Sequence, residues 1–151
     1  DSRIYLELQQ MFDDARAAGL ALFVREGYRT TKEQQQIMDD RIKEHENQGC
    51  SKKEAKKKAE EYVAIPGTSE HQLGLSVDIN ADTSKCSSDA VYQWLDENAY
   101  KYGFVKRYPE DKTDITSINN EPWHYRYVGK DAARTMKQEN LCLEEYLIKY
   151  K

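Results

Sequence analysis

The sequence is poor in cysteine, glycine and proline, and it contains no long apolar run. Its 151 residues include three cysteines, Cys50, Cys86 and Cys142, without a CxxC pair, which excludes a disulfide-rich scaffold and a four-cysteine zinc site. Seven glycines and three prolines exclude fibrous, collagen-like and broadly disordered chains. No apolar run approaches the roughly 18 residues that a membrane span needs, so we expect no segment that crosses a bilayer.

Positive charge is not in excess either. The net charge of −4 argues against a nucleic-acid partner held by bulk electrostatics. With 38% apolar residues, a chain of 151 residues supports one core, and we expect one domain over residues 1–151. The sequence starts at Asp1 without methionine, so we expect that an N-terminal targeting or anchor segment has been removed.

Hydrophobic periodicity predicts helices around a few short strands. Residues 107–120 show no convincing period and are predicted to be a loop. We therefore expect an α+β fold with a small, mostly antiparallel sheet surrounded by helices. Apolar spacing and capping residues predict helices over 3–18, from Thr30 or Thr31 to about 46, 51–62, 88–101, 130–139 and 143–149, and strands over 20–26 (buried), 75–79, 104–105 and 124–128.

The stretch 51–62 is the most charge-biased part of the chain. Five lysines stand against three glutamates, with only Ala55, Ala59 and Tyr62 forming a narrow apolar seam. This pattern favours a solvated helix face. The alternative is a basic rim that attracts an acidic polymer to a cleft.

Two of the three histidines lie beside carboxylates at suggestive spacing. His71 precedes Asp78 by seven residues, and Glu121 precedes His124 by three. A catalytic zinc ion uses three nitrogen or oxygen ligands and keeps one position open, and His71, Asp78 and His124 are a sufficient set. Glu121 is then left as a carboxylate near the metal, which is the role of a general base. A Glu-x-x-His pair alone is a weak signal, so ordinary structural histidines remain the alternative reading of the spacing.

Three separated motifs resemble those of the zinc D-alanyl-D-alanine carboxypeptidases, a family that includes VanY-type and VanXY-type peptidases and L,D-carboxypeptidases. Ser69 to Asp78 is similar to the S-x-H-x-x-G-x-x-x-D signature, and Glu121 to His124 to the E-x-W-H signature. Gly27 to Gln34 resembles the G-Y-R-x-x-x-x-Q segment. The resemblance runs from about residue 20 to about residue 130, with the motifs in the family's order.

The resemblance implies a zinc site in a cleft, with one Zn²⁺ held by His71, Asp78 and His124. It implies that Glu121 activates a water molecule and that Arg29 polarises the scissile carbonyl from across the cleft. Ser69 and Gln34 are expected near the C-terminal end of the peptide substrate. Trp123 is expected either to line the cleft or to pack in the core.

The implied activity is removal of the C-terminal D-Ala from peptidoglycan stem peptides ending in D-Ala-D-Ala, with a contribution to vancomycin resistance. The expected location is the bacterial cell envelope, with the stem peptide or its precursor as partner. An L,D-carboxypeptidase and a D-Ala-D-Ala dipeptidase share this machinery and remain alternatives. A different class would be a catalytically silent, zinc-stabilised module that binds the cell wall.

The sequence departs from the family pattern at two positions. Ser76 stands where the family often has alanine, and we expect it simply to pack. Glu26 stands where the family commonly has serine before Gly27. Glu26 either faces the cleft, where its charge would favour the ammonium group of a free dipeptide, or points to solvent or pairs with a nearby basic residue.

Overall fold

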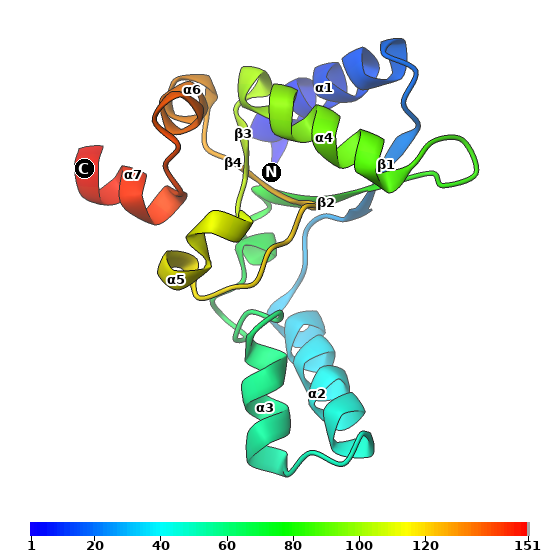
Figure 1. Cartoon of the computed structure of the whole chain (residues 1–151), viewed down its shortest axis with the longest axis vertical. Coiled ribbons are helices and arrows are strands. Elements are labelled where there is room, and N and C mark those ends of the chain that lie inside the picture. Colours follow the sequence, from blue (N-terminus) through cyan, green and yellow to red (C-terminus); the bar gives the residue numbers. More distant parts are fainter. Residues whose placement is uncertain (151) are drawn as a thin grey trace.

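Four short strands form one antiparallel sheet in the order β1-β2-β4-β3 (Figure 1). The computed structural model describes residues 1–150 and confirms the predicted α+β class. The strands are β1 Leu22–Glu26, β2 Ser76–Ala81, β3 Phe104–Lys106 and β4 His124–Tyr127, and the α-helices are α1 Tyr5–Ala17, α2 Thr31–Asn47, α3 Lys52–Glu60, α4 Ser88–Asn98, α5 Thr113–Thr116, α6 Lys130–Glu139 and α7 Leu143–Tyr150. Short 3-10 helices are η1 Ser2–Ile4, η2 Glu70–Leu73, η3 Ala99–Tyr102 and η4 Glu110–Lys112.

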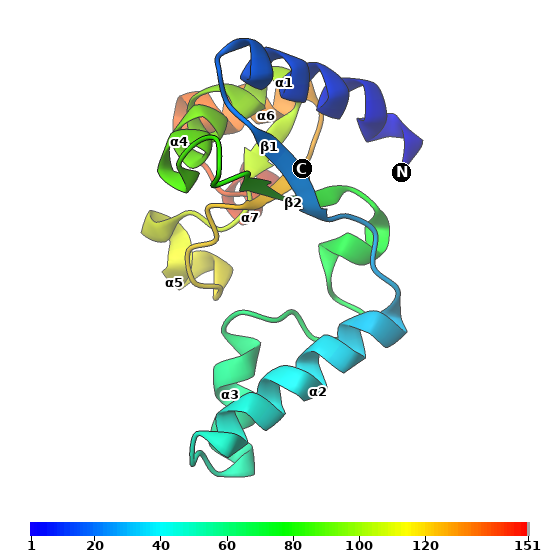
Figure 2. The same ribbon diagram turned by 90° about the vertical axis from the view of Figure 1, so that its right-hand side faces the viewer.

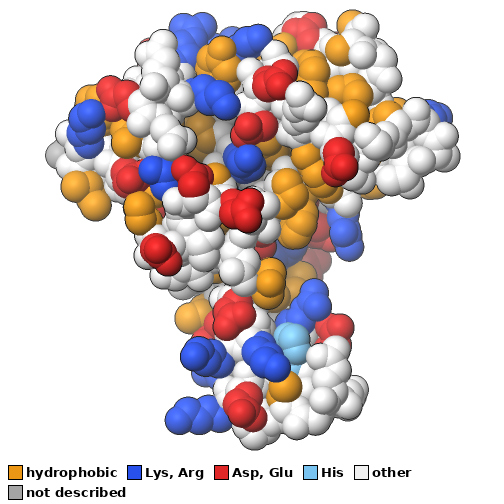
Figure 3. Space-filling model, in the orientation of Figure 1, with side chains coloured by type: hydrophobic (Ala, Val, Ile, Leu, Met, Phe, Trp, Pro, Cys, Tyr) orange, Lys and Arg blue, Asp and Glu red, His pale blue; other side chains and the backbone are white. Residues whose placement is uncertain are grey.

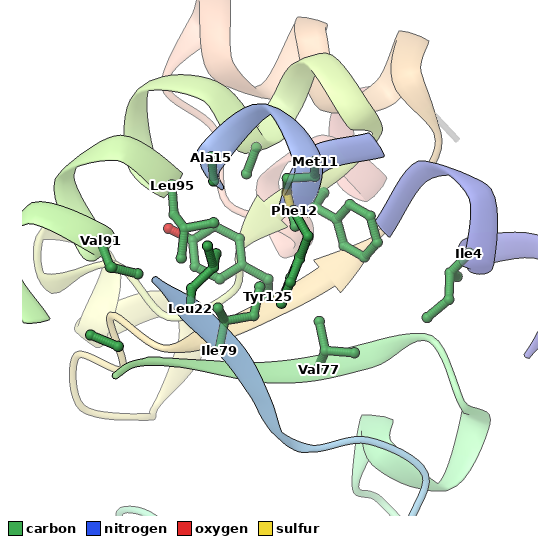
Figure 4. Packing of buried hydrophobic residues seen from close by; sticks show 13 residues of the cluster. Ile4, Met11, Phe12, Ala15, Leu22, Val77, Ile79, Val91, Leu95 and Tyr125 are labelled. Atoms are coloured by element: carbon green, nitrogen blue, oxygen red, sulfur yellow. The ribbon is translucent and has the colours of Figure 1, made fainter. Parts of the chain in front are cut away.

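Helices α1 and α4 cover one face of the sheet, and the main core lies between them and the strands (Figure 4). Successive strand residues point to opposite faces, so Val77 and Ile79 of β2 enter this core together with Tyr125 of β4. Met11 and Ala15 of α1 belong to the same core cluster and pack onto this face of the sheet. This layer fixes the position of β2 and β4.

Helices α2 and α3 form a hairpin that projects away from the sheet (Figures 1 and 2). Both helices begin with the predicted capping box, Thr30 with Glu33 and Ser51 with Glu54. The hairpin has a small core of its own, and its surface carries charges of both signs (Figure 3), as the solvated-face interpretation predicts. The buried apolar residues of this core are Met38, Ala59 and Val63.

Three local predictions were wrong. The apolar run after Gly19 forms strand β1, in which Leu22 is buried, but β1 is an edge strand, and Phe23 and Val24 are 47% and 40% exposed. The helical spacing over residues 3–18 also predicts Leu6 on the buried face of the first helix, but Leu6 is 75% exposed. Residues 107–120 are not only loop, since they contain η4 and α5. Within residues 1–150, the three cysteines form no disulfide.

Among the described helices, none is long and apolar enough to span a membrane.

Candidate zinc site and cleft

Strand pairing brings two of the three predicted ligands together. Asp78 of β2 lies directly opposite His124 of β4 in the antiparallel register. Because Val77 and Tyr125 point into the core, their neighbours Asp78 and His124 point to the other face of the sheet, side by side. The carboxylate Oδ1 of Asp78 lies 2.9 Å from His124 Nδ1.

The third ligand comes from η2, which precedes β2. This short helix ends at Gly74, whose φ of +66° lies in the left-handed region, and an added Cβ there would sit 2.8 Å from the Asp1 backbone nitrogen. The backbone of His71 accepts a hydrogen bond from the amide of Arg29, which ties η2 to the β1–α2 connection. The His71 ring places Nδ1 2.7 Å from the Gly27 carbonyl oxygen and turns Nε2 toward Asp78.

The donor atoms of His71, Asp78 and His124 all lie within 4.8 Å of one another. Burial alone would raise the pKa of Asp78, but hydrogen bonding to the two histidines lowers it well below its usual range. Burial would lower the pKa of His124, whereas its contacts with Asp78 and Glu70 raise it to about 9. The site therefore favours positive charge, and two imidazoles with one carboxylate are ligands that suit zinc. The structure thus brings the three predicted residues together, and their role as zinc ligands stays a prediction.

Glu121 lies at the edge of this group. Its carboxylate is 3.9 Å from His124 Nδ1 and its side chain is only 9% exposed. Burial and the charge of Asp78 raise the pKa of Glu121 to about 7, against the lowering effect of His124 and Arg29. A carboxyl group with this pKa can both accept and donate a proton near neutral pH.

Arg29 reaches the cleft from the start of the hairpin and is held at both ends of its guanidinium. Nη1 donates to Gln34 Oε1 at 2.7 Å, and Nη2 pairs with Glu26 at 3.4 Å. Gln34 in turn donates from Nε2 to the Ala64 carbonyl at 2.7 Å, which joins the two helical arms at their base. Gln34 thus positions Arg29, a contact that the sequence did not indicate.

The remaining predicted residues meet in one cleft of about 520 Å³ between the sheet and the hairpin. Ser69 and Trp123 both line this cleft. Of the two positions expected for Trp123, the cleft and the core, the structure shows the cleft. Glu26 also lines it and is 44% exposed while it pairs with Arg29, so both readings of Glu26 hold in part. Further lining residues that were not predicted are Arg25, Ile37, Arg41, Tyr62, Tyr108 and Ile118.

Two residues around His124 were missed by the sequence analysis. The Tyr108 ring lies 5.1 Å from the His124 ring, centroid to centroid. Glu70 faces the other side of the same imidazole, with Oε2 3.6 Å from Nε2. Glu70 occupies the variable position of the S-x-H motif. Its position next to His71 in the sequence was the one signal that could have indicated it.

Comparison with known proteins gives one consistent result. Residues 1–130 match the sequence profile of a family described as VanY, D-alanyl-D-alanine carboxypeptidase. A D-alanyl-D-alanine carboxypeptidase of Enterococcus faecalis (strain ATCC 700802 / V583) is 56% identical over 147 residues, which are 97% of this chain and 55% of that protein. The chain therefore spans about half the length of that relative.

Two solved structures of similar fold each share 56% sequence identity with this chain. One is VanYB in complex with D-alanine-D-alanine, with a TM-score of 0.97 and 56% identity, covering 99% of this chain and 82% of the other. The second is a variant of the vancomycin resistance D,D-pentapeptidase VanY from a VanB-type resistance cassette, in complex with Zn(II). Its TM-score is 0.95 at 56% identity, covering 97% of this chain and 83% of the other.

Proposed function

Because the chain belongs to the VanY family of D-alanyl-D-alanine carboxypeptidases, we propose that it is a zinc-dependent D,D-carboxypeptidase. Its substrate is a peptidoglycan stem peptide that ends in D-Ala-D-Ala, and its product is free D-Ala. The observation that carries this proposal is the convergence of a three-ligand zinc site with Glu121 and Arg29 in a single cleft. Zinc-bound and D-Ala-D-Ala-bound relatives of the same fold support it.

The residues divide the chemistry of amide hydrolysis between them. Zinc held by His71, Asp78 and His124 supplies a Lewis acid that lowers the pKa of a bound water and polarises a carbonyl. Glu121 accepts a proton from the attacking water and returns it to the amine of the departing D-Ala, so that one C–O bond forms as the C–N bond breaks. No covalent acyl-enzyme is formed, and no serine or cysteine nucleophile is required.

Arg29 supplies a second positive group for the oxygen of the scissile carbonyl. Its side chain is 13% exposed, and its Nε is buried without a hydrogen-bond partner among residues 1–150. A charged donor preorganised by Gln34 and Glu26 stabilises the negative oxygen that develops in the transition state. We place Ser69 and Trp123, which line the same cleft, at the substrate peptide.

The expected setting follows from the substrate. Stem peptides of mature wall lie outside the cytoplasm, so we propose action in the bacterial cell envelope, with the stem peptide or its precursor as the partner. Removal of the terminal D-Ala destroys the D-Ala-D-Ala end, and we propose a contribution to vancomycin resistance, since one structural relative is a vancomycin resistance D,D-pentapeptidase.

Two other activities share this machinery, and one of them has a specific observation in its favour. Glu26 places a carboxylate in the cleft, where it would attract the ammonium group of free D-Ala-D-Ala and support dipeptidase activity. The L,D-carboxypeptidase alternative has no comparable contact. A silent zinc-stabilised binding module is disfavoured, because a structural zinc site needs neither Glu121 nor Arg29.

The test is D-Ala release from a series of peptides by the zinc-loaded protein. The series contains D-Ala-D-Ala, a pentapeptide ending in D-Ala-D-Ala, and a tetrapeptide ending in a diamino acid and D-Ala. We expect the pentapeptide to be cleaved fastest, with loss of turnover on chelation and recovery on zinc addition. Cleavage of the tetrapeptide alone would make the protein an L,D-carboxypeptidase. If the zinc-bound protein released D-Ala from none of the peptides, the zinc-stabilised binding module would be the remaining interpretation.

A further inference from the structure

Glu70 joins the zinc site to the C-terminal helix through buried charges that the hydrolytic mechanism does not use. One carboxylate oxygen, Oε2, faces His124 Nε2 at 3.6 Å and accepts a hydrogen bond from Ser76 Oγ at 3.0 Å. The other, Oε1, accepts from Arg107 Nε at 2.8 Å. The two oxygens of Glu70 thus have different partners: Oε2 contacts His124 and Ser76, and Oε1 contacts Arg107.

The two ligand histidines use their ring nitrogens in opposite ways. His71 turns Nδ1 to the Gly27 carbonyl and Nε2 to Asp78, whereas His124 turns Nδ1 to Asp78 and Nε2 to Glu70. Metal-bound histidines almost always donate their other ring N–H to a carbonyl or carboxylate, which fixes the tautomer and ring orientation. Gly27 fills that place for His71, and Glu70 is the group available for His124.

Nothing else satisfies this nitrogen. His124 Nε2 is buried without a hydrogen-bond partner among the described residues, and the nearest carboxylate oxygen is that of Glu70. Closing the gap by about half an ångström would bring the pair to ordinary hydrogen-bond length. The Tyr108 ring beside the imidazole limits other orientations of the ring.

The carboxylate of Glu70 is itself fixed from the far side. Arg107 is only 10% exposed and donates through two nitrogens to the carboxylate of Glu144 on α7, with Nη1 to Oε2 at 3.0 Å. Arg126 of β4 lies 3.4 Å from Glu70 Oε1. A planar guanidinium held in this way fixes the direction of the carboxylate that it binds.

We infer that Glu70 is a positioning residue, whose carboxylate receives the Nε2–H of His124 so that Nδ1 faces the metal, and that Arg107 and Glu144 hold this carboxylate from α7. The inference rests on the proposed zinc site. It extends the metal site beyond its three ligands to the last helix of the chain. It also gives Ser76 a role beyond packing, since its hydroxyl bonds the same carboxylate oxygen.

The test measures zinc affinity by competition with a chromophoric chelator, independently of peptide cleavage. The variants are Glu70→Gln, Glu144→Gln and, as a matched control, Glu145→Gln. Glu145 is the neighbour of Glu144 on α7 but pairs with Lys112 instead of Arg107. Replacement of partners behind a metal-ligating histidine typically weakens metal binding by about 10- to 100-fold.

We expect Glu70→Gln to raise the zinc Kd at least about tenfold, Glu144→Gln to raise it a few-fold, and Glu145→Gln to leave it unchanged. The unfolding midpoint of each chelator-treated variant separates positioning from a structural role. The visible spectrum of the cobalt-substituted protein should shift in Glu70→Gln and not in Glu145→Gln, because cobalt bands report ligand geometry. Glu70→Asp, which keeps the charge, should recover part of the affinity.

Two outcomes would overturn the inference. One is a zinc Kd and cobalt spectrum in Glu70→Gln that equal those of the wild type. The other is a loss of affinity that follows the loss of stability and appears equally in Glu145→Gln. A wild type that binds zinc tightly but releases no D-Ala would remove the proposed function and leave this inference standing, since neither readout depends on turnover.

Discussion

The sheet and the α2–α3 hairpin contribute to the same cleft but are held together very differently. Asp78 and His124 lie on two paired strands whose opposite face is buried in the main core, so their spacing is fixed by backbone pairing and by packing together. The hairpin rests on a core of Met38, Ala59 and Val63 and is otherwise covered by charged residues. A metal site needs fixed spacing between its donor atoms, which the paired strands provide, whereas the hairpin wall of the cleft can change at little cost to the main core.

Among the described residues, polar contacts at the base of the hairpin link it to the rest of the molecule, including the hydrogen bond from Gln72 Nε2 of η2 to Thr31 Oγ1 at 2.6 Å. Gln34 of α2 bonds both Arg29 and the Ala64 carbonyl, and the amide of Asn119 donates to the Glu61 carbonyl at 3.4 Å. The orientation of Arg29 therefore depends on α2, whereas the spacing of Asp78 and His124 depends on the pairing of β2 with β4. Changes in the sheet should abolish chemistry, and changes in the hairpin should alter binding or specificity.

The largest effect is expected from the zinc ligands. His71→Ala or His124→Ala should lose most of the bound metal and all measurable peptidase activity, because two ligands cannot hold zinc in this geometry. His45→Ala is the matched control, since His45 lies on the hairpin helix α2, outside the group of His71, Asp78 and His124. Elemental analysis of the purified variants measures the zinc content, and full occupancy in both ligand variants would disprove the assignment.

Glu121→Gln should keep zinc and lose activity by roughly 10²- to 10⁴-fold, which is the usual contribution of a general base. The amide has nearly the same shape but cannot accept the proton of the attacking water. Elemental analysis and the kcat for pentapeptide cleavage together test this prediction. Turnover close to that of the wild type would move the role of base to another group.

Arg29→Ala should fold and bind zinc yet lose on the order of 3 kcal/mol of transition-state stabilisation, seen as a lower kcat/KM. Gln34→Ala should show a smaller loss in the same direction, because Gln34 only orients the guanidinium. A rise in KM with unchanged kcat would make Arg29 a clamp for the substrate and not a partner of the developing oxyanion.

The hairpin should respond to core damage without disturbing the metal. Met38→Ala removes the largest buried side chain of the small hairpin core and should cost about 2 kcal/mol, mainly by opening the hairpin locally. Hydrogen exchange should accelerate at amides of α2 and α3, KM should rise, and zinc content should stay the same. Equal acceleration in β2 and β4 would show that the two regions unfold as one unit.

What the sequence could predict follows the same division. The hairpin helices were predictable because their capping boxes at Thr30 and Ser51 are local signals. The grouping of His71, Asp78 and His124 was predictable from the resemblance of their motifs to those of a known family, since their spacing alone is a weak signal. The exposure of Phe23 could not be predicted, because only the order of the strands shows that β1 lies at the edge of the sheet.

Contacts that depend on the tertiary fold could not be predicted from the sequence either. Glu70 and Glu144 are 74 positions apart in the chain and meet only through Arg107, so no local pattern indicates that they act together. The bond from Gln34 to the Ala64 carbonyl, 30 positions further along the chain, likewise requires the hairpin to fold back on its own base. The sequence thus indicated which residues gather in the cleft and not which contacts hold them in place.

The smallest effect, and the one that tests specificity most directly, is expected at Glu26. Its carboxylate lines the cleft opposite Asp78 across β1 and β2 and pairs with Arg29 at 3.4 Å. A free dipeptide brings an ammonium group close to the scissile bond, where a longer stem peptide has a neutral amide. A partly shielded carboxylate should therefore favour the dipeptide by about 1 to 3 kcal/mol.

The measurement is the ratio of kcat/KM for D-Ala-D-Ala to kcat/KM for a pentapeptide ending in D-Ala-D-Ala. Glu26→Ser should lower this ratio about tenfold, which corresponds to about 1.4 kcal/mol. Release of Arg29 from its partner affects both substrates and cancels in the ratio, so the change reports the ammonium contact alone. Glu97→Ser, on helix α4 across the sheet from the cleft, removes the same charge and should leave the ratio unchanged. An unchanged ratio in Glu26→Ser as well would assign the choice of substrate to the hairpin wall of the cleft, where Arg41 and Tyr62 lie.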